Sequence, residues 1–78
     1  MNYTICMTEC VYSGQKISLD AMGNKYTLCY IVPLADGTHD YTSKTFASLN
    51  EALSVYQKFV EYFAKGLYAV VDRKNLLK

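Results

Sequence analysis

The sequence predicts an α+β domain in which an antiparallel sheet of three to five strands carries one amphipathic helix on one face. Short segments rich in β-branched and aromatic residues follow one another from residue 2 to residue 46. Turn residues separate these segments, and an apolar helix with capping residues at both ends follows at about 48–65. Because strands joined by short turns pair antiparallel, the expected order is strand, strand, strand, strand, helix, strand.

The size and composition of the chain indicate one folded unit. Hydrophobic residues make up 51% of the chain and charged residues 19%, which favours a globule over disorder. A chain of 78 residues has room for one small core. We therefore expect residues 1–78 to form a single compact domain, with the last few residues as a short helical turn or a frayed tail.

The first two strands are expected at 2–12 and around Ile17 and Leu19, with a turn at 13–15 between them. Strict alternation divides the side chains of the first strand between two faces. The larger apolar side chains then share one face: Tyr3, Ile5, Met7 and Val11. The other face holds Thr4, Cys6, Thr8, Cys10 and Tyr12.

The third and fourth strands are expected at 25–34 and 40–46. The turn between the second and third strands falls at Met22-Gly23-Asn24. Asp36-Gly37 predicts a hairpin between the third and fourth strands, because glycine accepts a positive φ. Pro33 cannot donate a hydrogen bond to a neighbouring strand, so it marks a strand end or an edge.

The helix has clear start and stop signals. Ser48 and Glu51 form a capping box, and Gly66 is a natural left-handed stop after Lys65. The segment 67–71 is β-like and is expected to return to the sheet as a last strand.

The helix carries more apolar surface than one packing face requires. One stripe recurs at spacings of four and three residues: Leu49, Leu53, Tyr56, Val60, Phe63 and Leu67. Val55, Phe59 and Tyr62 form a second stripe beside it. Together they cover about 200° of the helix, where a single packing face needs a little over 100°. Either the sheet curls around the helix or the tail covers it, or the second stripe stays exposed and meets a partner.

These stripes make the helix the expected interface. We expect Val55, Phe59 and Tyr62 to contact a partner, with Tyr68 and the rim residues Lys58 and Lys65 as weaker candidates. A homodimer is the simplest form, because a two-fold interface needs one self-complementary patch, and a foreign protein is the other option. The expected function is a non-catalytic protein–protein interaction module, similar in size and type to accessory or inhibitor proteins of bacteriophages and plasmids.

The chain has eight tyrosines, and these lead to an alternative function. Tyr26, Tyr30 and Tyr56 are expected at the margins of the core. Four others are expected to be at least partly exposed: Tyr12, Tyr41, Tyr62 and Tyr68. Sheet tyrosines with the basic tail at 73–78 could bind single strands in a nucleic-acid-associated accessory protein. The net charge of +1 and the lack of a Lys/Arg groove argue against this alternative.

The sequence has little catalytic or metal-binding character, so we expect no enzyme, metal or cofactor. Cys6 and Cys10 would lie about 13 Å apart on a strand, too far to ligate one zinc ion. A nucleophilic pair of Cys29 and His39 is the enzymatic alternative. Glycine-rich phosphate loops and serine nucleophile motifs are absent.

The expected compartment is the cytoplasm. The longest apolar run, Leu67–Val71, is too short to span a membrane, and the first residues lack the features of a cleaved signal. Three cysteines leave an odd thiol, which favours a reducing environment.

Overall fold

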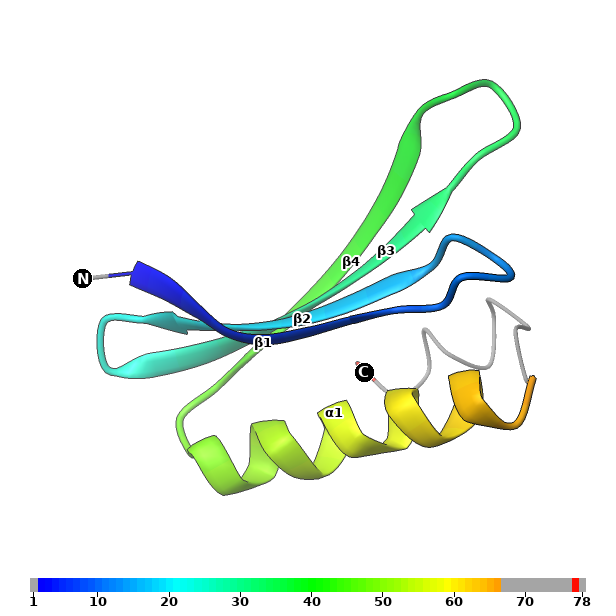
Figure 1. Ribbon diagram of the computed structural model, residues 1–78. Coiled ribbons are helices and arrows are strands. Elements are labelled where there is room, and N and C mark those ends of the chain that lie inside the picture. Colours follow the sequence, from blue (N-terminus) through cyan, green and yellow to red (C-terminus); the bar gives the residue numbers. More distant parts are fainter. Residues whose placement is uncertain (1, 67–76, 78) are drawn as a thin grey trace.

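The computed structural model describes residues 2–66 and Leu77. The elements, in chain order, are β1 (Asn2–Glu9), β2 (Lys16–Met22), β3 (Lys25–Pro33), β4 (His39–Phe46) and α1 (Leu49–Ala64) (Figure 1). The four strands pair in chain order as one antiparallel sheet, and α1 packs on one face, mainly on β2 and β3. The predicted α+β architecture is confirmed. The last strand, predicted over 67–71, lies outside the described residues.

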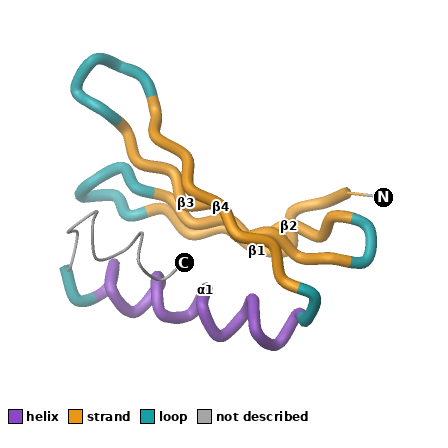
Figure 2. Tube along the Cα trace, turned by 180° about the vertical axis from the view of Figure 1, so that it is seen from behind, coloured by secondary structure: helices purple, strands orange, loops and turns teal. Residues whose placement is uncertain are grey.

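The sheet has one face toward α1 and an opposite face, here called the open face. Figure 2 shows the sheet from behind, with the β3–β4 turn rising away from α1 and the β1–β2 turn nearer to the helix. The β1–β2 turn lies at the end of the sheet where α1 finishes (Figure 1). This arrangement leaves β1 and β4 as the two edge strands among the described elements.

A β-bulge in β1 changes which of its side chains share a face. Thr4 pairs with Asp20 and Cys6 with Leu19, so Ile5 is an extra residue opposite β2. Tyr3 therefore pairs with Ala21 on the helix face. The predicted alternation, which put Tyr3 and Met7 on one face, was wrong, because an inserted residue reverses every face assignment beyond it.

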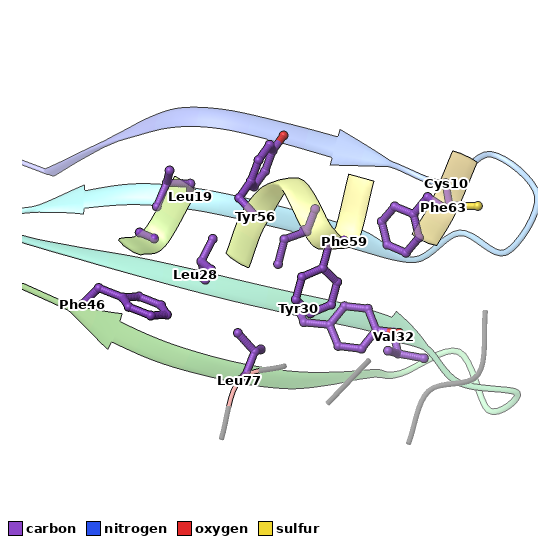
Figure 3. Packing of buried hydrophobic residues seen from close by; sticks show 12 residues of the cluster. Cys10, Leu19, Leu28, Tyr30, Val32, Phe46, Tyr56, Phe59, Phe63 and Leu77 are labelled. Atoms are coloured by element: carbon purple, nitrogen blue, oxygen red, sulfur yellow. The ribbon is translucent and has the colours of Figure 1, made fainter. Parts of the chain in front are cut away.

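The core lies between α1 and the helix face of the sheet (Figure 3). Phe59 is fully buried, with its ring centroid 4.9 Å from that of Tyr30 and 6.4 Å from that of Phe63. Leu77 is also buried in this cluster. The Tyr56 hydroxyl forms a hydrogen bond with the Thr8 hydroxyl, which ties α1 to β1.

The helix packs on the sheet through one central stripe, whereas the sequence predicted packing through one stripe and an interface through the stripe beside it. The residues of α1 that are buried are Ala52, Tyr56, Phe59 and Phe63. Their stripe lies between the two predicted ones. The prediction that Phe59 is exposed was therefore wrong, since the sheet needs the middle of the apolar arc and leaves the flanks half-buried.

The predicted ends of the helix and the β3–β4 turn are confirmed, but the β1–β2 turn begins earlier than predicted, because β1 ends at Glu9 rather than at residue 12. The Ser48 hydroxyl accepts a hydrogen bond from the Glu51 N–H, and Gly66 has a φ of 73° just beyond the end of α1. Asp36 accepts hydrogen bonds from the Thr38 N–H and hydroxyl, and Gly37 has a φ of 88°. These turns fix the register that brings the core residues together.

Candidate interaction surface

The strongest candidate for a functional surface runs along β1 and the turn that follows it. Five of the eight large apolar side chains that are exposed in the described part of the chain lie there. They define the β1 edge patch: Tyr3 (60% exposed), Ile5 (37%), Met7 (59%), Val11 (82%) and Tyr12 (85%). A concentration of this kind marks an interaction surface more often than scattered single exposed residues do.

The position of β1 in the sheet adds backbone groups to this patch. β1 pairs with β2 on one side, and no other strand among the described residues pairs with it on the other. An edge strand presents N–H and C=O groups that an added strand can bind. Apolar side chains and hydrogen-bonding backbone therefore occur together on this edge.

The β1–β2 turn holds Val11 and Tyr12 in place. The Cys10 N–H donates to the Gln15 carbonyl at 2.7 Å, and the Gly14 N–H donates to the Cys10 carbonyl at 2.8 Å. The buried Gln15 side chain accepts a hydrogen bond of 2.7 Å from the Tyr30 hydroxyl inside the core. The exposed pair thus sits on a turn that the core anchors, which lowers the entropic cost of binding.

A hollow of about 240 Å³ lies beside this turn. Its walls come from the end of β1, the turn and the last part of α1: Thr8, Glu9, Cys10, Val11, Tyr12, Val60, Phe63 and Ala64. Most of these side chains are apolar, so the hollow suits an apolar side chain of a partner.

The other edge strand, β4, has a different character. It includes His39, Asp40 and Lys44, and the Lys44 ammonium lies 5.2 Å from the centre of the Phe46 ring. Charged side chains on an edge strand discourage pairing with another sheet. Tyr41 is the exposed large apolar residue of this strand, at 63%.

The open face of the sheet carries a hydrogen-bonded polar cluster around Asp20. The Thr4 hydroxyl donates to one oxygen of Asp20 at 2.8 Å, and the Ser18 hydroxyl donates to the other at 3.1 Å. Burial, and secondarily the negative charge of Asp20, raise the pKa of the Cys29 thiol. A thiol with a raised pKa is a poor nucleophile at neutral pH.

The hypothesis of a Cys29–His39 nucleophile pair is not supported by the strand register. Cys29 pairs with Ser43, whereas His39 pairs with Pro33. Four residues along β4 correspond to about 13 Å, so the two side chains do not meet. Among residues 2–66 and Leu77, no three His, Cys, Asp or Glu side chains lie close enough together to hold a metal ion.

The predicted interface residues are distributed over several environments. Val55 and Tyr62 are half-buried on α1, and Lys58 and Lys65 are exposed. Phe59 belongs to the core, and Tyr68 lies outside the described residues. A role for the remaining helix residues in an interface stays a prediction.

The tyrosines follow the predicted division where they are described. Tyr30 and Tyr56 are buried and Tyr26 is half-buried against the core, while Tyr12 and Tyr41 are exposed. Tyr26 and Tyr30 face α1, so they offer no stacking surface for bases. Within the predicted basic tail at 73–78, the structure describes Leu77, an apolar and buried residue, and the basic residues lie outside the described part of the chain.

The fold and the surface together define a small α+β protein with an apolar sheet edge. In the described part of the chain, no helix is both long and apolar enough to cross a membrane. No protein family, curated protein or solved structure matches this chain.

Proposed function

We propose that the protein is a small non-catalytic interaction module that binds another protein chain through the β1 edge patch. The observation that carries this proposal is the gathering of exposed apolar side chains on an edge strand and its anchored turn. Such an edge offers a partner main-chain hydrogen bonds and apolar burial at the same place. The proposal keeps the predicted type of function and moves the interface from the helix to the sheet edge.

In this proposal the protein acts in the cytoplasm as an accessory or inhibitor protein, of the kind that bacteriophages and plasmids carry. It changes its partner by binding rather than by chemistry. The raised pKa of the Cys29 thiol and the separation of Cys29 from His39 support a non-catalytic role. No disulfide joins the three cysteines, all of which the structure describes, and this suits the compartment.

The test compares the chains that three tagged proteins retain after cross-linking in cells. The wild type is compared with Val11→Ser/Tyr12→Ser, which changes the patch, and with Tyr41→Ser, which changes the other edge. A second copy with a different tag is co-expressed, so that self-association and foreign partners are both detected. Far-UV circular dichroism checks that each variant is folded.

We expect the wild type and Tyr41→Ser to retain one chain in a fixed ratio, and the double variant to retain at least tenfold less of it. Equal retention by all three proteins contradicts the proposal. A wild type that retains no chain in cells and stays monomeric in solution contradicts it as well.

A further inference from the structure

The β1 edge patch also indicates its partner, an inference that rests on the proposed function. We propose that the partner is a second copy of this chain, with the two β1 strands paired antiparallel about a two-fold axis perpendicular to the sheet. Two four-stranded sheets then form one continuous sheet, and both copies of α1 lie on the same face of it.

Charge favours β1 over β4 as the strand that meets its own copy. From Asn2 to Thr8, β1 has no charged side chain. Antiparallel pairing of the whole strand places the two copies of Glu9 at opposite ends, about 24 Å apart, where their repulsion is screened. A β4 pair would instead rely on surface ion pairs between Asp40 and Lys44, which contribute little in water.

The β-bulge determines a register in which the two copies match. Cross-strand partners have to lie on the same face of the sheet. Because of the bulge, Tyr3 and Thr8 both lie on the helix face, and Thr4 and Met7 both lie on the open face. Tyr3 can therefore pair with Thr8 of the second copy, and Thr4 with Met7. In a regular strand, residues five apart lie on opposite faces, and this register would fail.

This register places an exposed ring next to the apolar hollow. The hollow lies on the helix side of β1, beside Thr8. Tyr3 of the second copy stands opposite Thr8 on the same face, so its ring can enter between Val11 and Val60. Since α1 packs mainly on β2 and β3, it leaves the outer side of β1 open to the second sheet. One surface thus has both the ring and the hollow, as a two-fold interface requires.

The exposed side chains of the β1 edge patch supply about half of the area that a stable dimer needs. With about 200 Å² for a buried tyrosine and about 100 Å² for a smaller apolar side chain, the β1 edge patch exposes about 450 Å². A stable interface buries about 800 Å² per partner. The β1 backbone and the walls of the hollow add to the side-chain area of each copy.

The first experiment measures molar mass by light scattering after size-exclusion chromatography, over a range of concentrations. Met7→Glu places a charge close to the proposed axis, and Tyr41→Glu is the matched control on the other edge. We expect the wild type and Tyr41→Glu to have twice the monomer mass of 8.9 kDa. We expect Met7→Glu to be a monomer, with the dissociation constant raised at least tenfold.

The second experiment tests the register through Cys6. With the axis between Ile5 and Cys6, the Cα atoms of the two Cys6 residues lie about 6 Å apart, within the range that a disulfide spans. Mild oxidation should link wild-type and Cys29→Ser dimers covalently and leave Cys6→Ser unlinked on a non-reducing gel.

Three outcomes overturn the inference. If the wild type is monomeric at every concentration, the partner is not a second copy. If the wild type is a dimer that Tyr41→Glu dissociates and Met7→Glu leaves intact, the dimer does not form through β1. A dimer that oxidises without a Cys6 disulfide overturns the register.

The proposed function is tested separately. A monomeric wild type leaves it standing if the β1 edge patch still retains a foreign chain in cells, and retention of no chain contradicts it.

Discussion

Replacing Phe59 decides between the two explanations of the apolar helix surface. As an exposed interface residue, Phe59 would contribute to association and little to folding, within about 0.5 kcal/mol. In the structure its ring is fully buried, 4.9 Å from the centre of the Tyr30 ring and 6.4 Å from that of Phe63. Phe59→Ala therefore removes buried area and leaves a cavity, at a cost of about 3–5 kcal/mol in the free energy of unfolding.

That cost is large for a chain of this length. At about 0.05–0.15 kcal/mol per residue, the free energy of unfolding of the 78 residues is about 4–12 kcal/mol. Phe59→Ala removes between about a quarter and all of it, so this variant should unfold at a clearly lower urea concentration than the wild type. Phe59→Leu keeps most of the volume and is expected to lose about 1–2 kcal/mol, which a folded variant tolerates.

The assay is urea unfolding followed by circular dichroism, at one fixed protein concentration because association also stabilises the fold. Val55→Ala is the control, since its half-buried side chain lies on the flank of the same helix. We expect it to lose less than Phe59→Ala does. If both Phe59 variants unfold within about 0.5 kcal/mol of the wild type while association is lost, the placement of Phe59 in the core is refuted.

Three further predictions concern the turns, a buried hydrogen bond and pH. Gly14→Ala and Gly23→Ala each meet a positive φ and should cost about 1–2 kcal/mol in urea unfolding; Gly14→Ala should cost more, because a proline ring lies 3.1 Å from its new Cβ. Tyr30→Phe removes the donor to Gln15 and should cost about 0.5–1.5 kcal/mol in the same assay. The raised pKa of Cys29 favours its protonated form in the folded state. Its contribution to stability is present below pH 9 and is lost as the pH rises through the raised value, so alkaline unfolding should be less steep for Cys29→Ser.

Local signals in the sequence were sufficient for the order of the elements that the structure describes, β1 to α1. Ser48 and Gly66 mark the two ends of α1 through capping and a positive φ, which depend on a few neighbouring residues. Gly37 and Asp36 identify the β3–β4 turn for the same reason. Preferences of this kind act within one turn of chain, so the sequence alone shows them.

The hydrophobic pattern of the helix does not by itself show which side of α1 packs on the sheet. Two stripes covering about 200° allow the sheet to contact either stripe or the region between them. In the structure the middle of the apolar arc contacts the sheet, where the Phe59 ring lies 4.9 Å from the Tyr30 ring of β3. A choice between neighbouring faces depends on the shape of the partner surface, which is set by side chains far away in the sequence.

The β1 edge patch was missed because the bulge and the turn both interrupt the strand pattern. The segment 2–12 reads as one long strand, and alternation then assigns Val11 to a sheet face. In the structure the chain leaves the sheet after Glu9, and Val11 and Tyr12 occupy a turn where polar residues are usual. A valine and a tyrosine that are more than 80% exposed in a turn conflict with local preference. Conflicts of this kind collect at functional surfaces, which is why these two residues, rather than the helix, are the place to begin a mutational search.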